Sequence, residues 1–482
     1  MFSARRLNSS WASRYIPFIS VALLAFTYPV VARAAEAHSQ FDGSELGLAW
    51  IIPFIGILIS IALLPLITPR FWEHRFGAVS AFWACALLAP MAVAFGPDVT
   101  WNALLHTLLL EYLPFIILLF ALFVVAGGIN ISGNLVGTPS TNVAILTVGT
   151  LLASVIGTTG ASMVLIRPMI RANAARRRKV HVFIFFIFLV SNIGGSLTPL
   201  GDPPLFLGFL KGVDFFWTFE HMLLPMLMMA GALLAIFYVF DLLSWRHEKG
   251  LHDTRAQHQL RVVGLHNILY LFGILAAVLA SGTWNSGISV NVYDMELGLE
   301  GLGRDVVLLV ISYFSYKSTR PSIRIENAFT WKPIQEVAIL FAGIFVTMVP
   351  ALAILRAGTA GVAAPLAEFV TSPSGQPINA AYFWVTGALS SFLDNAPTYL
   401  VFFNLAGGVP ESLMGPLANT LLAISAGAVF MGANSYIGNA PNFMVKSICE
   451  ERGIRMPSFF GYMIWSGTIL LPLFLAVTWI FF

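Results

Sequence analysis

The segment from Ser191 to Gly212 constrains this chain most, because it places helix breakers and an acid inside a long apolar region. Within eleven residues it contains Gly194, Gly195, Pro199, Gly201, Pro203 and Pro204, and Asp202 stands among them. A continuous helix facing lipid cannot contain these residues, because the freed backbone N–H and C=O groups would have no water to bond. The helix must therefore break inside protein or beside a water-filled cavity.

A similar interruption follows about 237 residues later, in the run from Gly438 to Asn442. When the two segments are aligned, Gly201 matches Gly438 and Asp202 matches Asn439. Two interrupted apolar segments at corresponding places in two halves of a chain indicate the binding site of a secondary transporter.

The composition indicates an all-α polytopic membrane protein. Of the 482 residues, 58% are hydrophobic and 10% are charged, which leaves too little polar surface for a soluble domain. The net charge of +3 is small and the basic residues cluster in short loops, so we expect no nucleic-acid partner. Cys85 and Cys449 are too few for a disulfide scaffold or a metal cluster.

Residues 1–35 have the pattern of a secretory signal peptide. Three arginines precede a short apolar core, and Ala32-Arg33-Ala34 forms an A-x-A cleavage site. Cleavage would leave the mature N-terminus outside, in a multi-pass protein of a bacterial inner (plasma) membrane. The alternative is an uncleaved first span.

The positive-inside rule then predicts about ten crossings and two hairpins. The predicted crossings begin at Leu46, Ala78, Leu104, Val180, Met222, Asn267, Val306, Ile334, Leu417 and Phe459. The crossing from Val306 is expected to be short or tilted. The basic loops at 70–75, 171–179, 246–261 and 317–332 are placed in the cytoplasm.

Two short apolar runs, each followed by a polar turn and a return run, predict re-entrant hairpins. The run from Val143 to Ile156, about 14 residues, is too short to span the bilayer. We expect its tip at Thr158-Thr159-Gly160 and its entry from the cytoplasm. The second tip, at Asp394 to Thr398, is expected to enter from outside.

An offset of about 236 aligns the two tips and places Ser154 on Ser390. Entry from opposite sides predicts two inverted-topology repeats, each with a re-entrant hairpin and a discontinuous transmembrane helix. The expected regions are a signal peptide at 1–35, N-terminal spans at 36–103, a first repeat at 104–243, a loop with connecting spans at 244–333, and a second repeat at 334–482.

Polar side chains at these four interruptions form the predicted transport site. An unpaired acid near the midplane is costly, so it should be protonated, bound to a cation or paired. We expect Asp202 and Asp394 to bind a transported Na⁺ and exchange it for a proton. The other predicted ion-binding residues are Thr158, Thr159, Ser162, Asn395, Thr398, Asn434, Asn439 and Asn442; weaker candidates are Ser191, Asn192, Ser390 and Ser391.

Each of these assignments has a structural alternative. The two aspartates could cap half-helices, since Asp is a favoured N-cap. Arg167 and Lys446 could neutralise a carboxylate substrate or an acidic site, or could extend to the cytoplasmic interface. Glu111 and Glu336 open their spans and could be interfacial.

The paired hairpins, the GDPP and GNAP breaks and the DNAPT tip together resemble the ion transporter superfamily. That superfamily includes citrate–metal symporters, NhaD-type sodium–proton antiporters and arsenite-pump-type channels, and the likeness is greatest to the citrate-transport or sodium–proton-antiporter branch. The resemblance covers nearly the whole mature chain. It implies two inverted repeats, a scaffold region beside a mobile transport region, and a homodimer. The Ser-Asn-Thr signatures of dicarboxylate members are replaced here by TTGAS and DNAPT.

The sequence thus favours a secondary Na⁺/H⁺ antiporter that works by alternating access. The alternative is a cation- or proton-coupled symporter of citrate or a related carboxylate, and a passive channel is a further class. The chain has no HExxH, GxSxG or Walker pattern, so we expect neither an enzyme nor a cofactor. The expected partners are a monovalent cation, a proton, an organic anion in the alternative, and the lipid bilayer.

Overall fold

The computed structural model describes residues 42–133, 135–248, 261–284, 286–292, 295–327 and 329–482. The predicted signal peptide lies outside these residues. Nine helical segments of the described chain are long and apolar enough to cross a membrane, which confirms a multi-pass, mainly helical membrane protein. All but one of these nine segments coincide with predicted crossings, and the exception is α6.

The N-terminal part consists of η2 (Leu48–Ile51), α2 (Ile52–Ile67) and α3 (Pro69–Phe95), followed by α4 (Pro97–His106), η3 (Thr107–Tyr112) and α5 (Leu113–Ala126). The last three form one helical path, in which η3 has π-helical hydrogen bonding. The basic loop predicted at 70–75 was wrong, because these residues form the first turns of α3. Pro69 starts that helix at a position where its missing N–H leaves no intrahelical bond unmade.

The first half of the chain continues with α6 (Pro139–Ile156), α7 (Thr158–Ala172), α8 (Val180–Leu189), η4 (Ile193–Leu197), α9 (Pro203–Leu210) and α10 (Trp217–Arg246). The predicted break between Ser191 and Gly212 is confirmed, since η4 and an irregular stretch separate α8 from α9. Helix α6 is longer than predicted, because Thr138 Oγ1 accepts a bond from Thr141 N and caps it. Its length therefore no longer excludes a crossing, and the re-entrant hairpin stays a prediction.

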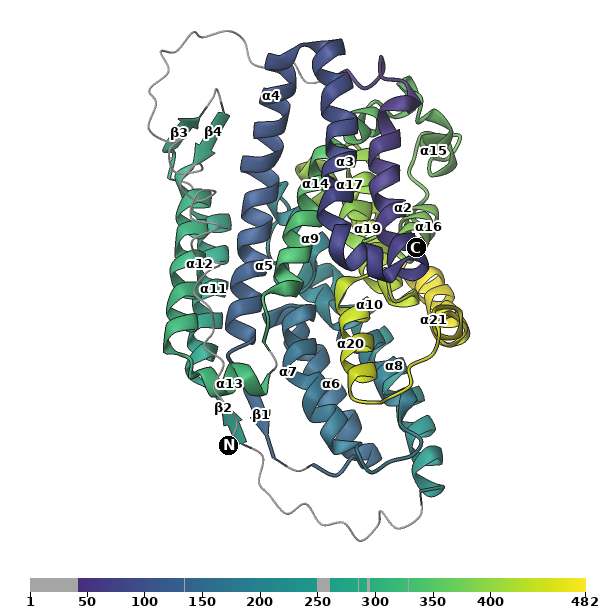
Figure 1. Ribbon diagram of the computed structural model, residues 1–482. Helices are drawn as coiled ribbons and strands as arrows, with labels where there is room; N and C mark the ends of the chain where they lie inside the picture. Colours follow the sequence, from purple (N-terminus) through teal and green to yellow (C-terminus); the bar gives the residue numbers. More distant parts are fainter. Residues whose placement is uncertain (1–41, 134, 249–260, 285, 293–294, 328) are drawn as a thin grey trace.

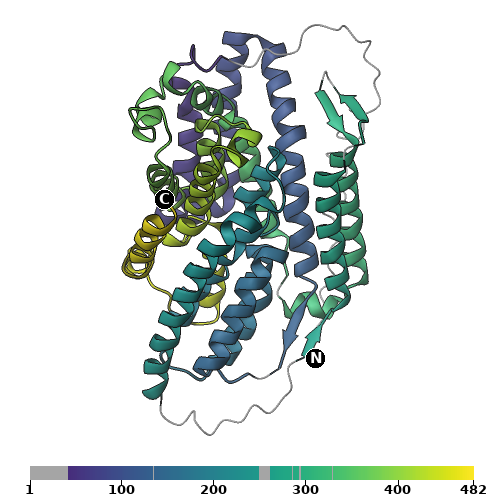
Figure 2. The ribbon, with the colours of Figure 1, turned by 180° about the vertical axis from the view of Figure 1, so that it is seen from behind.

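The middle of the chain forms α11 (His266–Thr283), α12 (Leu299–Ser318) and α13 (Pro321–Glu326). Helices α11 and α12 lie beside α5 along one side of the molecule, as both ribbon views show (Figures 1 and 2). The predicted short or tilted crossing from Val306 falls on α12, which begins at Leu299 and has 20 residues. Helix α12 is not among the nine candidate spans of the described chain, so this crossing stays a prediction.

Two small antiparallel ladders modify the all-α expectation. Strand β1 (Asn130–Ser132) pairs with β2 (Arg261–Val263), and β3 (Ser289–Val292) pairs with β4 (Met295–Gly298). The first ladder joins the end of α5 to the segment that precedes α11.

The second half of the chain contains α14 (Lys332–Arg356), η5 (Gly358–Ala360), α15 (Ala364–Phe369), α16 (Asn379–Ser390), α17 (Asn395–Leu405), α18 (Pro410–Met414), α19 (Ala418–Met431), η6 (Gly432–Asn434), α20 (Ala440–Glu451) and α21 (Phe459–Phe481). The predicted break between α19 and α20 is confirmed. Both hairpin turns lie earlier than predicted: Gly157 makes the first, and residues 391–394 make the second. The motif DNAPT therefore starts a helix and does not form a loop.

Corresponding hydroxyl contacts recur in the two halves at a spacing of 237 residues. Thr198 Oγ1 donates to Ser154 O, and Ser435 Oγ donates to Ser391 O. This spacing supports the predicted repeat but replaces the match of Ser154 with Ser390. The inverted orientation of the two repeats stays a prediction.

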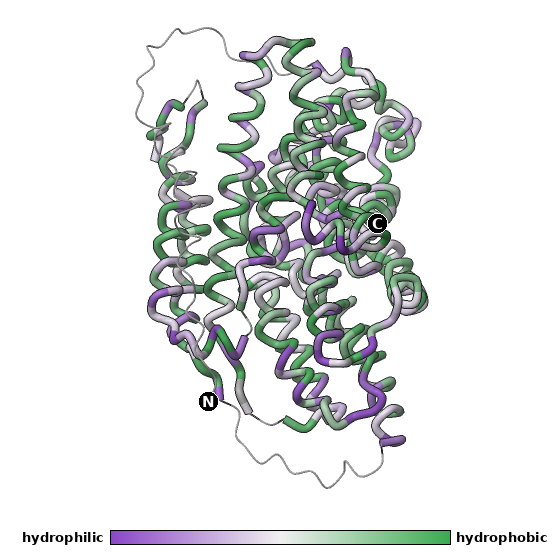
Figure 3. The backbone as a smooth tube through the Cα atoms, in the orientation of Figure 1, coloured by the Kyte–Doolittle hydropathy of each residue, from purple (hydrophilic) through white to green (hydrophobic). Residues whose placement is uncertain are grey.

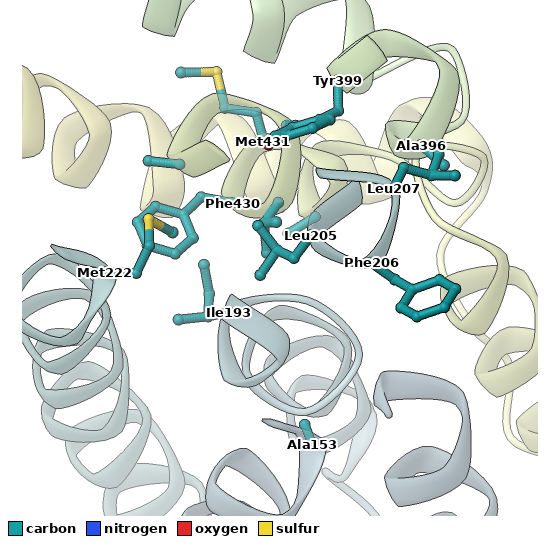
Figure 4. Close-up of a cluster of buried hydrophobic side chains, with 14 of the residues drawn as sticks. Ala153, Ile193, Leu205, Phe206, Leu207, Met222, Ala396, Tyr399, Phe430 and Met431 are labelled. Carbon is teal, nitrogen blue, oxygen red and sulfur yellow. The ribbon is translucent and has the colours of Figure 1, made fainter. Parts of the chain in front are cut away.

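The two halves share one core around the breaks. Figure 4 shows Leu205, Phe206 and Leu207 of α9 among side chains of η4, α17 and α19. Helices α6 and α7 occupy the lower half of the molecule in Figure 1, whereas α16 and α17 lie in the upper half. Hydrophilic segments lie at mid-height between hydrophobic helices (Figure 3), so the interruptions meet where the molecule is otherwise apolar.

Candidate functional site

Asp202 stands at the junction between the irregular stretch and α9. Its backbone is extended, with φ −143 and ψ 142, and its side chain makes no capping bond to α9. Asn439 precedes α20 in nearly the same conformation, with φ −153 and ψ 138. Pro203 is the first residue of α9 and Pro441 is the second of α20, positions that proline favours. Neither Asp202 nor Asn439 makes a side-chain capping bond, so both side chains can contact other elements.

Three side chains from three other elements donate hydrogen bonds to the Asp202 carboxylate. Thr158 Oγ1 and Asn439 Nδ2 each lie 3.0 Å from Oδ1, and Asn395 Nδ2 lies 2.5 Å from Oδ2. Thr158 and Asn395 begin α7 and α17, so both hairpin turns and both breaks converge on one acid. Asp202 is 2% exposed, and it is hydrogen-bonded as a buried polar group requires.

Close backbone approaches bring these elements together. Gly157 has φ +77, a left-handed conformation that favours glycine, and the next residue, Thr158, donates its N–H to Gly201 O at 2.8 Å. A Cβ at Gly201 would lie 2.1 Å from Gly195 O, so a larger residue would push apart the two backbone segments that meet in the break. Gly438 approaches Gly432 O in the same way.

A second layer of buried amides supports Asp202 and its partners. Asn439 Nδ2 also donates to Ser191 O at 3.1 Å. Asn192 Nδ2 donates to Asn442 Oδ1 at 2.7 Å, and Asn442 Nδ2 donates to Gly432 O at 2.9 Å. The first two of these bonds join the two breaks directly, from one half of the chain to the other, and the third lies within the second break.

The other predicted site residues lie around this centre in different roles. Ser162 Oγ lies 2.9 Å from Ser191 Oγ, and Thr398 Oγ1 donates to Asp394 O within α17. Asn434 Nδ2 donates to Ser391 Oγ at 2.9 Å.

Asp394 is placed differently from Asp202. Its Oδ1 accepts the Ala396 N–H at 3.1 Å, so it caps α17. It is half-buried. Its neighbour Asn395 is fully buried, and Asn395 Oδ1 has no hydrogen-bond partner. The predicted ion-binding role of Asp394 stays a prediction.

The four ionisable candidates outside the interruptions do not meet Asp202. Lys446 pairs with Glu450 at 2.7 Å on its own helix. Glu111 pairs with Lys211 at 2.5 Å, and Glu336 accepts a bond from Trp72 Nε1 at 3.2 Å. Arg167 does not line the cavity that lies beside Asp202.

A cavity of about 100 Å³ lies beside Asp202. Its walls come from α5, from the start of α14, from the turn before α7, from the break before α9 and from the start of α20. They include Leu122, Thr158, Thr159, Asp202, Val337 and Pro441. A site for one water needs about 10–15 Å³ of volume of this kind, so the cavity has room for several water molecules. Thr159, a predicted site residue, lines the cavity without contacting Asp202.

The electrostatics of the cavity are set by one acid and four helix ends. Helices α7, α9, α14 and α20 all begin at its wall, and a helix N-terminus carries roughly half a positive charge. Among the described residues that line it, none is Lys, Arg or His. Asp202 therefore faces partial positive charge without a full cationic partner.

Some contributing residues were not singled out from the sequence. Thr198 and Ser435 fix the breaks through the corresponding contacts given above. The signal was present, because each stands three residues before the glycine that precedes Asp202 or Asn439. Within the part of the chain that the structure describes, no three His, Cys, Asp or Glu side chains gather in a group that could hold a metal ion.

Comparison with known protein families gives a match over nearly the whole chain. Residues 43–482 match the model of a family described as "Putative citrate transport". No curated protein matches the chain.

Proposed function

Because the chain belongs to this citrate-transport family, we propose that it is an alternating-access secondary transporter that moves a small carboxylate, such as citrate, together with a proton or a cation. We place it as a homodimer in a bacterial inner membrane. The observation that carries the proposal is that Asp202 and four helix N-termini share one cavity.

The shared cavity supplies a reason for coupling. Helix N-termini attract a carboxylate, whereas a charged Asp202 repels it. Two like charges 5 Å apart repel by about 3 kcal/mol at an effective dielectric constant of 20, which is roughly a hundredfold in affinity. A proton or cation that neutralises Asp202 removes this repulsion, and the coupling between the two ligands is reciprocal.

The position of the cavity supports alternating access. Leu122 of α5 and Val337 of α14 form one wall, and the turn before α7 with the starts of α9 and α20 forms the other. Movement of the second wall relative to the first would expose the cavity to either side in turn. Asp202 and its donors Thr158 and Asn439 would move together, because both donors are hydrogen-bonded to Asp202.

Na⁺/H⁺ antiport is the second candidate, and one observation favours it. Asn395 Oδ1 is buried without a partner next to the bond that Asn395 Nδ2 makes to Asp202. An unpaired amide oxygen beside a carboxylate is suited to a monovalent cation, with Asp394 one residue away as a second acid. In this function a cation and a proton would alternate at the site without any organic anion.

Transport in proteoliposomes that contain a pH-sensitive dye separates the two functions. Uptake of labelled citrate that requires a proton or Na⁺ gradient is the result expected for symport. Proton release on addition of Na⁺ or Li⁺ in the absence of any organic anion would instead establish antiport. Citrate flux without any counter-ion dependence would contradict both and would indicate a channel.

A further inference from the structure

Arg167 is the most unusual cation in the described chain outside the site. It lies on α7 and is half-buried, and its Nη1 atom is shielded from solvent without any hydrogen-bond partner. A sequestered, unpaired guanidinium nitrogen is costly unless an acceptor reaches it. Simple extension to an aqueous interface would have left that nitrogen solvated, so an incoming acceptor would satisfy it.

Two further arginines gather near Arg167. Arg452 follows α20, and its charge and that of Arg171 act on Arg167. The acids whose charges act on the group are Glu451, which acts on Arg167, and Glu326, which acts on Arg171. Neither acid forms an ion pair within 4.0 Å of the three arginines among the described residues. The group therefore has more positive than negative charge.

The arginine group lies on the same helix faces as the cavity. On α7, Thr159, Met163 and Arg167 are spaced by four residues and share one face. Thr159 lines the cavity, and Arg167 stands about 12 Å further along the helix axis. Helix α20 runs beside α7 and connects the cavity wall at Met444 with Arg452.

A separate apolar cluster borders the cavity. It consists of Phe123, Val124, Met163 and Ile334, with Met444 packed against it. Phe123, Ile334 and Met444 also line the cavity, and Met163 stands on α7 four residues after Thr159 and four before Arg167. An anion that leaves the cavity past Met163 would next meet Arg167.

We propose that Arg167, Arg171 and Arg452 form a second anion-binding site, which takes a carboxylate group of the cargo beyond the apolar cluster. The site lies at the end of the molecule that the positive-inside rule places in the cytoplasm. Guanidinium groups bind carboxylates through paired, charge-assisted hydrogen bonds. This inference rests on the proposed carboxylate function only for the identity of the anion.

Chemical protection tests the site without a transport measurement. The full-length protein in neutral-lipid nanodiscs is treated with phenylglyoxal, and modified arginines are located by peptide mass spectrometry. Citrate, compared with chloride at equal ionic strength, is expected to slow modification of Arg167 and Arg452 about tenfold, the effect of roughly one charge-assisted bond. The exposed Arg177 serves as an internal control and is expected to react equally in both salts.

The same experiment in nanodiscs with anionic phospholipid separates the two sources of an oxyanion. Protection by citrate in neutral lipid supports the proposal. Protection that needs anionic lipid and ignores citrate would overturn it and assign the group to a phospholipid headgroup. Equal modification in every condition would also overturn it.

Transport from each side provides the second readout. In proteoliposomes sorted by orientation, Arg167→Gln is expected to raise the KM for citrate about tenfold from the side of Arg452 and less than twofold from the other. Arg177→Gln removes the same charge outside the group and should leave both values unchanged. If citrate protects Arg167 while the wild type moves no carboxylate, the proposed function fails and the anion site stands. If the wild type transports citrate but citrate does not protect Arg167, the proposed function stands and the second anion site fails.

Discussion

The two acids at the interruptions, Asp202 and Asp394, have opposite environments. The Asp202 side chain makes no bond to its own helix and accepts three bonds from side chains of three other elements. Asp394 accepts a bond from the backbone of α17, which it caps. An acid beside a helix break is available to side chains of other elements when it does not cap the helix that follows it.

The repeat explains why the two environments differ. At the spacing of 237 residues, Asp202 corresponds to Asn439 and Thr158 to Asn395. The two corresponding break residues hydrogen-bond to each other at 3.0 Å, and both turn residues donate to the same carboxylate. Two acids at this distance would repel, whereas an acid opposite an amide forms a hydrogen bond. The site therefore requires that the halves differ at this one position.

Replacement of Asp202 is expected to have the largest effect. Asp202→Asn removes the charge that a proton or cation neutralises and leaves amide donors facing another amide. Transport in proteoliposomes should fall about 100-fold or more, because bonds to a charged group contribute roughly 1.5–3 kcal/mol each. Normal insertion, shown by size-exclusion chromatography, controls for misfolding. Coupled transport within tenfold of the wild type would remove Asp202 from the mechanism.

Movement of the acid between the halves tests their correspondence. Asn439→Asp places a second carboxylate against Asp202 and should lower the free energy of unfolding by about 3 kcal/mol, the effect of an unpaired buried charge. Asp202→Asn in the same chain should recover more than half of that loss, because one acid again faces one amide. Denaturant unfolding of both single variants and the double variant measures this interaction. Strictly additive effects would show that the two positions are independent.

Much of this arrangement could be predicted from local chemistry. Both breaks follow from glycine and proline that no helix accommodates, and their correspondence is visible as GDPP and GNAP. The turn positions could not be predicted as well, because Asn395 and Thr158 begin helices although they read as loop residues. Their bonds to Asp202 join residues far apart in the chain. No local pattern encodes which of two acids such distant donors will reach.

Replacement of Asp394 sharpens the comparison at a smaller expected effect. Asp394→Asn keeps an oxygen that can cap α17, since Asn and Asp are similarly good N-caps. Transport should fall less than tenfold, whereas Asp394→Ala should also lower the free energy of unfolding by about 1 kcal/mol. A loss from Asp394→Asn as large as that from Asp202→Asn would establish the cation-binding role predicted from the sequence.

A comparison of stability alone comes from two serines that correspond in the repeat, Ser154 and Ser391. Ser154 Oγ accepts a buried backbone bond from Leu197 N at 3.1 Å, and Ser391 Oγ accepts a side-chain bond from the half-buried Asn434. Ser154→Ala should therefore lower the free energy of unfolding by about 2 kcal/mol and Ser391→Ala by about 1 kcal/mol, because an unsatisfied buried N–H is the more costly loss. Denaturant unfolding measures both. A larger loss from Ser391→Ala than from Ser154→Ala would contradict this order. It would mean that the second break depends more on its serine than the first break does.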